Sequence, residues 1–355
     1  MKFGREILKN VQGYVPGEQP KGVGIVKLNT NENPYPPSAK VLEAVQTTST
    51  EAIRRYPDPV AARLREVAAE HYGFESADWV VAGNGMDELL AIAIRTFADP
   101  GDSVLSPYPT YVLYETLALL HGARFVGVDL DGEFQLTEDF YRTPARICFL
   151  PRPNAPSGVC APRSAVERLC RAFDGLVVVD EAYADFADDN CIDFPKRFEN
   201  VIVMRTFSKA YSLAGLRLGL AFARPEIIAE FMKTKDSYNL NAATQSAGVA
   251  ALQDQSYTAS CIRRICTNRA RLSEELGRLG FDVPESKANF VLAHWKRDSP
   301  TARDIFDQLC ARAVFVRYFD APRLRDALRI SVGSDSDIER FLDALREILG
   351  SDRTA

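Results

Sequence analysis

The sequence predicts an α/β fold: a large domain with a mostly parallel sheet, followed by a smaller α+β C-terminal domain. Short strands that are apolar throughout alternate with helical segments along the first part of the chain, as expected for a parallel sheet buried on both faces. After about residue 252 the pattern changes to a long charged helix and then to shorter strands and helices, which indicates the second domain.

The elements of the large domain are defined by apolar runs and helical spacing. Strands are expected at residues 79–82, 103–105, 125–128, 147–150, 176–180 and 201–204. Helices are expected at 61–72 and 86–97, and Gly73 follows the first of them as a stop signal.

The smaller domain is expected to begin with the charged helix and to end with an amphipathic one. The expected elements are a helix at 258–279, a strand at 290–292, a helix at 302–311, and strands at 314–316 and 328–332. The last helix carries apolar residues at helical spacing, namely Ile338, Phe341, Leu342, Leu345 and Leu349.

The N-terminal residues up to about 38 are rich in Gly, Pro and Asn and predict an extended arm. We therefore divide the chain into an arm that joins the small domain (1–45), a large domain (46–252) and a small C-terminal domain (253–355).

Charge and composition exclude several classes of partner. The formal net charge of −5 gives no electrostatic reason to expect nucleic acid or an anionic membrane, and no apolar run approaches membrane-spanning length. The seven cysteines are an odd number without a C-x-x-C pair, and the N-terminus lacks the apolar core of a signal peptide, so we expect a reduced, cytoplasmic protein. The three histidines lie far apart and predict no metal site.

Three expected strands are followed by polar residues at the edge where parallel strands bind ligands. The first such segment, 83–88, joins a strand to a helix. Its two glycines and the free N–H groups of the helix start could cradle a phosphate, and an ordinary strand–helix turn is the open alternative. The segment lacks the third glycine of a dinucleotide site, which disfavours a nicotinamide-dependent dehydrogenase.

Asp180 stands at the end of the second of these strands. A buried carboxylate there is costly unless a positive group meets it. The protonated nitrogen of a pyridine ring would be such a group, and the charged ring would act as an electron sink. A helix N-cap or a salt bridge in the core is the alternative.

Lys209 follows the third strand, among small and hydroxyl residues with few charges nearby. A desolvated lysine has a lowered pKa and can attack an aldehyde. Thr206, Ser208 and Arg217 supply hydroxyl and guanidinium donors for a phosphate.

The segment 206–219 resembles the lysine motif of the fold-type I aminotransferases, and among them it is most similar to the histidinol-phosphate aminotransferase family. The resemblance covers nearly the whole chain. Besides the lysine motif it rests on residues 31–34, 55–57, 83–88, 109–111, 153–158, 180–183 and 328–333. Several motifs in the same order are far more specific than any single motif.

The resemblance implies pyridoxal 5′-phosphate as the cofactor, carried by Lys209 as a Schiff base, and it implies that Lys209 later moves a proton between substrate and cofactor carbons. Asp180 is expected to pair with the pyridine nitrogen, and Tyr183 to donate to the phenolic oxygen. Tyr111 is expected to stack on the ring, with an ordinary core tyrosine as the alternative. The expected phosphate contacts are Gly85, Met86, Asp87, Thr206, Ser208 and Arg217.

The resemblance also implies a homodimer in which Tyr56 reaches the phosphate of the neighbouring subunit's cofactor. Arg329 is expected to bind the anionic group of the substrate, with Arg317, Tyr14 and Asn31 nearby. For Arg317, a surface arginine on a strand is an equally open interpretation.

One position departs from the family pattern. The family usually has Asn-Asn-Pro-Thr-Gly where this chain has Asn-Ala-Pro-Ser-Gly at 154–158. The asparagine before the proline normally donates to the cofactor's ring oxygen, and Ala155 cannot. Either Asn154 makes this contact, or Tyr183 and water make it alone. Loss of the hydrogen bond is expected to raise the pKa of the Schiff base, and Ala155→Asn to lower it in a spectral titration.

The expected reaction is a transamination in two halves, in which an amine displaces Lys209 and a 2-oxo acid, expected to be 2-oxoglutarate, then receives the amino group. L-Histidinol phosphate is the expected donor, which places the reaction in histidine biosynthesis. An aromatic amino acid aminotransferase and a threonine-phosphate decarboxylase share the lysine motif and are the rival enzymes.

Two kinds of protein without catalytic activity are the remaining alternatives. A regulatory domain that binds pyridoxal phosphate normally carries a DNA-binding segment, and this chain has neither a spare domain nor a basic patch for one. A structural α/β scaffold would leave Lys209 among apolar residues without a purpose.

Overall fold

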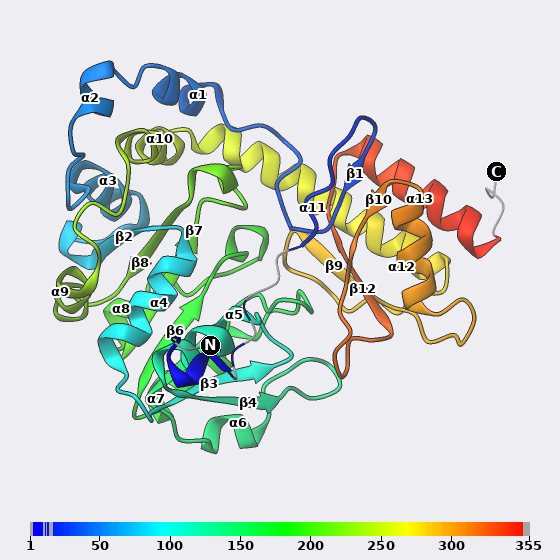
Figure 1. The fold of residues 1–355 in the computed structure, drawn as a ribbon, viewed down its shortest axis with the longest axis horizontal. Coiled ribbons are helices and arrows are strands. Elements are labelled where there is room, and N and C mark those ends of the chain that lie inside the picture. The colour runs from blue at the N-terminus through cyan, green and yellow to red at the C-terminus, as the bar shows by residue number, and fades with distance from the viewer. Residues whose placement is uncertain (1–2, 10, 12, 14–16, 351–355) are drawn as a thin grey trace.

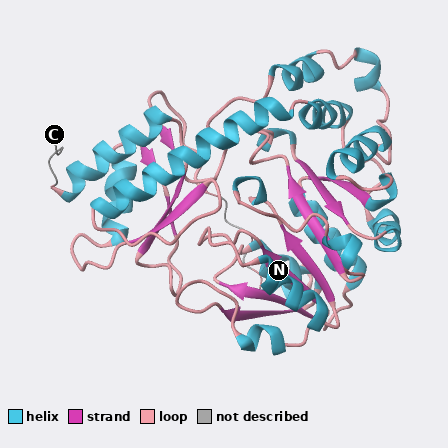
Figure 2. Cartoon of the chain, turned by 180° about the vertical axis from the view of Figure 1, so that it is seen from behind, coloured by secondary structure: helices cyan, strands magenta, loops and turns pink. Residues whose placement is uncertain are grey.

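The computed structural model describes residues 3–9, 11, 13 and 17–350. A seven-stranded sheet with helices on both faces makes up the larger part, and a three-stranded sheet covered by long helices lies beside it (Figure 1). Figure 2 shows the same two sheets from behind, on opposite sides of a region of loops.

The large sheet confirms all six expected strands and adds a seventh. Its strands are β2 (Val80–Asn84), β3 (Ser103–Tyr108), β4 (Arg124–Asp129), β5 (Ile147–Pro151), β6 (Leu176–Asp180), β7 (Val201–Thr206) and β8 (Leu218–Phe222), in the order β2-β8-β7-β6-β5-β3-β4. All neighbours are parallel except those of β8, which runs antiparallel to both β2 and β7. Because β8 is reversed, Arg217 just before it lies at the edge where the other strands end.

Helices cover both faces of this sheet. They are α3 (Ala62–Tyr72), α4 (Met86–Phe97), α5 (Leu113–His121), α6 (Glu138–Arg142), α7 (Arg163–Ala172), α8 (Phe194–Arg197), α9 (Pro225–Thr234) and α10 (Ala242–Gln253). Side chains alternate along a strand, so Val178 packs with α4, α5 and α9, while Val177 and Val179 pack with α6, α7 and α8. This two-sided burial explains why the central strands are apolar throughout.

The expected helices at 61–72 and 86–97 are confirmed as α3 and α4. Gly73 ends α3 with φ +74°, and its N–H bonds back to the last turn of the helix. The remaining short helices are α1 (Ala39–Gln46), α2 (Thr50–Arg54) and the 3₁₀ turns η1 (Glu6–Lys9), η2 (Ala77–Trp79), η3 (Ala184–Phe186) and η4 (Ala214–Leu216).

The C-terminal part contains the elements that its sequence predicts, with one difference. The elements are α11 (Gln255–Arg278), β9 (Phe290–His294), α12 (Ala302–Ala311), β11 (Arg317–Tyr318), β12 (Ala327–Ser331) and α13 (Asp335–Leu349), and the antiparallel sheet has the order β11-β12-β9. The strand expected at 314–316 is only β10 (Val314–Phe315), and it pairs with β1 (Val26–Lys27) of the arm instead of joining this sheet. The domain boundaries at residues 45 and 252 stay a prediction.

Candidate active site

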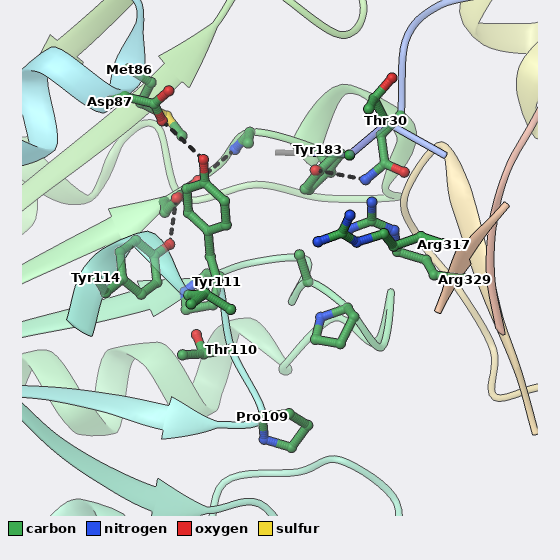
Figure 3. Close-up of a pocket in the computed structure, with 18 of the residues that line it drawn as sticks. Thr30, Met86, Asp87, Pro109, Thr110, Tyr111, Tyr114, Tyr183, Arg317 and Arg329 are labelled. Atoms are coloured by element: carbon green, nitrogen blue, oxygen red, sulfur yellow. Dashed lines mark hydrogen bonds between the residues drawn. The ribbon is translucent and has the colours of Figure 1, made fainter. Parts of the chain in front are cut away.

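A cavity of about 720 Å³ lies where β6 and β7 end and β8 begins. Its lining comes from the arm at residues 29–32, from segments after β2, β3, β6 and β7, and from Arg317 and Arg329 of the small sheet. Tyr111 and Tyr114 lie on one side, and Arg317 and Arg329 extend from the other (Figure 3). The cavity thus lies at the edge of the sheet where the polar residues after the strands were expected to meet.

The side chain of Lys209 points into this cavity from the segment after β7. Burial lowers the pKa of its ammonium group to about 8, and the nearby guanidinium of Arg329 adds to the shift. Its Nζ donates to the carbonyl oxygen of Thr30 at 3.2 Å. A substantial fraction of Lys209 is therefore neutral, and nucleophilic, near physiological pH.

Asp180 and Glu181 end β6 and face different surroundings. Glu181 is fully buried and pairs with Arg205 at 2.9 Å, so it is part of a structural ion pair in the core. Asp180 lines the cavity, and its carboxylate makes no ion pair with the described part of the chain. Burial raises the pKa of its carboxyl to about 6. The salt-bridge alternative thus holds for Glu181, whereas Asp180 is available to a cation in the cavity.

The start of α4 and Arg217 lie together at the cavity and could bind an anion. Gly85 caps α4 with φ +83°, and a Cβ added there would lie 2.5 Å from Nη2 of Arg217. The guanidinium also contacts Oδ2 of Asp87 at 3.3 Å and donates to Oγ of Ser208 at 3.3 Å. Thr206 accepts from the backbone N–H of Ser208 and lines the same cavity. Free N–H groups, hydroxyls and a guanidinium are the donors that phosphate prefers.

Two tyrosines of the cavity were expected to contact the cofactor ring. Tyr111 lines the cavity, and its hydroxyl donates to Oδ1 of Asp87 at 3.3 Å. Tyr183 also lines it, with its ring 5.9 Å from Nζ of Lys209. The Tyr183 hydroxyl accepts a hydrogen bond from Nδ2 of Asn31 at 3.0 Å.

Arg317 and Arg329 are register partners on the neighbouring strands β11 and β12, and both line the cavity. Nη2 of Arg329 donates to the carbonyl oxygen of Asn29 at 2.9 Å. Both guanidinium groups lie beside the ring of Phe319, at 5.3 and 5.4 Å. Two like charges held this close favour an anion between or in front of them. The position of Arg317 in the cavity lining argues against its being a simple surface residue.

Comparison with known proteins agrees with this geometry. The sequence model described as "Aminotransferase class I and II" matches residues 23–345. The histidinol-phosphate aminotransferase of Microcystis aeruginosa is 44% identical over 347 residues, which cover 98% of this chain and 99% of the relative. The chain belongs to the histidinol-phosphate aminotransferase family.

Further members of the histidinol-phosphate aminotransferase family support the assignment. The enzyme of Geotalea uraniireducens is 45% identical over 348 residues, 97% of this chain and 99% of the relative. The crystal structure of histidinol-phosphate aminotransferase from Sinorhizobium meliloti in complex with pyridoxal 5′-phosphate superposes with a TM-score of 0.85 at 28% identity, over 91% of this chain and 90% of that chain. The predictions of a fold-type I aminotransferase and of this family are confirmed.

Three expected residues that the structure describes do not line the cavity. Gly85 lies beside the guanidinium of Arg217. Tyr56 is 81% exposed and stacks on Tyr238 with ring centroids 4.5 Å apart. Tyr14 falls outside the described residues.

Asn154 is the third, and the expectation that it replaces the asparagine missing at 155 finds no support in its contacts. Its side chain is buried, and Nδ2 donates to the carbonyl of Pro109 at 3.2 Å and to Oγ of Ser157 at 2.9 Å. Both amide protons are thus used, one within the loop and one by the segment after β3. Ala155, in contrast, does line the cavity.

Tyr114, which was not expected in the site, lines the cavity and donates a hydrogen bond to Asp180. Tyr114 follows Tyr111 by one helical turn at the start of α5, and this spacing was the available signal. Asn29, Thr30 and Phe319 were also missed as lining residues, because they come from irregular or short segments.

The described residues give no indication of a metal site or a membrane segment. Among them no group of three or more His, Cys, Asp or Glu side chains could hold a metal ion. Within the same part of the chain no helix is long and apolar enough to cross a bilayer. All seven cysteines are free in the structure.

Proposed function

We propose that this chain is a pyridoxal-phosphate-dependent enzyme that transfers the amino group of L-histidinol phosphate to 2-oxoglutarate, giving imidazole acetol phosphate and glutamate. One observation supports the proposal more than any other. Lys209, whose pKa is lowered to about 8, faces a cavity that also holds a buried carboxylate and an anion site. The names of the relatives supply the substrate.

The cavity fits pyridoxal phosphate at both of its ends. The buried carboxylate of Asp180 needs a positive partner, which the protonated pyridine nitrogen would provide. At the other end, a side chain at Gly85 would fill the space beside Arg217, so the backbone cradle depends on glycine. The phosphate would bind to the N–H groups of Met86 and Asp87 and to Thr206, Ser208 and Arg217. When bound, the cofactor supplies an electron sink for the substrate carbon that carries the amino group.

The other residues of the cavity take their roles from this placement. Lys209 would hold the cofactor through Nζ and, once displaced, carry a proton between substrate and cofactor carbons. Tyr111 would stack on the ring, and Tyr183 would donate to the ring oxygen. Thr30 accepts from Lys209 in the structure and would keep the amino group oriented when it is free.

Arg317 and Arg329 would bind the anionic end of each substrate. Histidinol phosphate has no carboxylate, so its phosphate would bind to these arginines, and a carboxylate of 2-oxoglutarate would use the same site. Asn31 lines the cavity on the same side, and Tyr14 is proposed as a further contact.

We also propose a homodimer in the cytoplasm. Ile53 in α2 and Tyr56 just after it are large side chains that are 74% and 81% exposed. Burial against a second copy would remove this apolar surface from water and bring Tyr56 to the partner's cofactor.

A donor screen tests the function. The visible band of the purified enzyme loaded with pyridoxal phosphate should disappear on addition of L-histidinol phosphate and return on addition of 2-oxoglutarate. A stronger response to phenylalanine or tyrosine would instead favour an aromatic aminotransferase. Release of carbon dioxide from phosphothreonine would favour the decarboxylase.

A further inference from the structure

Asn31 is held in a fixed conformation although it belongs to an arm with little regular structure. Its φ of +55° lies in the left-handed region, which asparagine tolerates better than most residues. Its backbone N–H donates to Oγ of Ser331 at 2.8 Å, and its carbonyl oxygen accepts from Nδ2 of Asn289 at 3.0 Å. All three residues are buried. The arm is thus fastened to β12 and to the segment before β9.

These contacts also decide which way the side-chain amide of Asn31 points. The hydroxyl of Ser331 accepts from the backbone of Asn31, so its single proton is available to Oδ1 of Asn31, 3.0 Å away. With its oxygen at Ser331, the amide directs Nδ2 at the hydroxyl of Tyr183, 3.0 Å away. Two residues separated by 152 positions in the chain are thereby joined.

The direction of this hydrogen bond has a chemical consequence for Tyr183. A phenol that accepts from Asn31 uses one lone pair for that contact and keeps its own proton for a different acceptor. Hydrogen bonds in a chain polarise one another, so accepting from the amide makes the phenol a stronger donor.

Tyr183 also lies beside the position where the family's asparagine is missing. It packs against the cluster formed by Ala155, Ala288 and Phe290, and its ring meets that of Phe290 edge to face at 5.0 Å. The hydroxyl that Asn31 directs therefore belongs to the same end of the cavity as Ala155.

We propose that Asn31 is a positioning residue, which turns the hydroxyl of Tyr183 toward the cofactor's ring oxygen and strengthens its donation there, in place of the amide that Ala155 lacks. This inference rests on the proposed function, because it assigns Tyr183 to a bound pyridoxal phosphate. Donation to the ring oxygen draws electron density from it and weakens its hold on the proton of the Lys209–cofactor linkage.

The charges around Lys209 would act on the same proton and must stay constant in a test. They are Arg329 on β12, Glu32 on the arm, Asp87 on α4 and Arg217 before β8. A suitable substitution at Asn31 is glycine, because it removes the amide, adds no charge and adopts a positive φ without strain.

The experiment is a spectral titration of the Lys209–cofactor linkage in the loaded enzyme, with four variants and their combinations. Asn31→Gly should raise its pKa by roughly half a unit. Tyr183→Phe should raise it further, and Asn31→Gly should add nothing in the Tyr183→Phe background. Ala155→Asn should lower the pKa and should offset the shift of Asn31→Gly in the double variant. Ser331→Ala, which frees the amide to rotate, should cause a smaller rise.

Leu28→Ala is the control for general loosening of the arm. Leu28 lies three residues earlier in the arm, is buried and does not line the cavity. In this variant the spectral titration of the Lys209–cofactor linkage should give the same pKa as in the unaltered enzyme. A shift of equal size in this control would mean that general loosening of the arm is responsible, and would overturn the inference. An unchanged linkage pKa in Asn31→Gly would also overturn it. So would a shift from Asn31→Gly that is as large in the Tyr183→Phe background as in the unaltered enzyme. Absence of any visible band in the unaltered enzyme would instead contradict the proposed function.

Discussion

The hydroxyl of Tyr114 donates a 2.5 Å hydrogen bond to Oδ2 of Asp180, joining the start of α5 to the end of β6. The backbone N–H of Ala182 donates to the other carboxylate oxygen at 3.0 Å. Burial opposes the charge of Asp180, and these two donors favour it. The carboxylate is thus prepared to meet a positive ring nitrogen.

Removing this donor should weaken cofactor binding. Tyr114→Phe leaves the ring in place but deprives the carboxylate of a hydrogen bond, and hydrogen bonds to charged groups contribute roughly 1.5–3 kcal/mol. We expect the Kd for pyridoxal phosphate to rise about tenfold or more, measured by absorbance titration of the apoprotein. Tyr141→Phe, on α6 at the opposite face of the sheet, is the control and should leave the Kd unchanged. Equal affinities in the two variants would contradict this role.

The same buried carboxylate predicts a conflict between stability and cofactor binding. The pKa of Asp180 is raised from 3.8 to about 6, so its carboxyl stays protonated to a higher pH in the folded state than in the unfolded state. The stability of the apoprotein contributed by this group is therefore highest below about pH 4, falls as the pH rises to about 6, and stays low above it.

Asp180→Asn should remove this pH-dependent cost. In urea unfolding of the apoprotein, the variant should gain roughly 1–3 kcal/mol over the unaltered chain at about pH 8, and the gain should shrink as the pH falls toward 4. Cofactor affinity should decrease in the same variant. A variant that is less stable at about pH 8 would show that Asp180 has a structural role instead.

The close approach of Gly85 and Arg217 predicts a specific effect of one methyl group. Gly85→Ala places Cβ against the guanidinium and should move it away from the phosphate site. We expect the Kd for pyridoxal phosphate to rise about tenfold or more.

Gly73→Ala serves as the control for backbone strain. Gly73 has a similar φ of +74°, but no heavy atom lies within 4 Å of an added Cβ. Gly73→Ala should lose about 1–2 kcal/mol of stability from its left-handed backbone. Gly85→Ala should lose more, because its ψ of 161° belongs to a region that glycine alone adopts readily. Only Gly85→Ala should lose cofactor affinity. Equal affinities would argue against the cradle.

The paired arginines predict a loss of substrate binding. Arg329→Lys keeps the charge but removes the planar fork that binds an anion with two hydrogen bonds, so kcat/KM for the donor should fall roughly 10- to 100-fold, mainly through KM. Arg325→Lys is a matched control on an exposed neighbour that pairs with Asp320. If steady-state kinetics give the same kcat/KM for Arg329→Lys and Arg325→Lys, Arg329 does not bind the anionic group of the substrate.

Much of the site could be predicted because it follows from the ends of buried strands. Asp180 comes directly after one apolar run and Lys209 follows shortly after another, and parallel strands bring such ends to one edge. The order of the strands could not be predicted in the same way, and β8 was not predicted at all. Gly219 interrupts the apolar pattern of β8. A side chain is excluded at this position because a Cβ there would lie 2.6 Å from the backbone nitrogen of Met86.

Contacts between distant parts of the chain could not be predicted from the sequence. Nothing in the local pattern around Asn31 indicates Ser331 or Tyr183, since the contact depends on how the arm crosses the small sheet. For Tyr56, the expected contact needs a second copy of the chain.

The most direct test of the central claim is to find which residue carries the cofactor. The loaded enzyme would be reduced with borohydride, digested, and mapped by mass spectrometry. We predict a pyridoxyl-phosphate adduct on Lys209 and none in Lys209→Arg, and a rate of cofactor capture by the apoprotein that rises with pH through about 8, where Lys209 loses its proton. An adduct on another lysine, or none at all, would contradict the account.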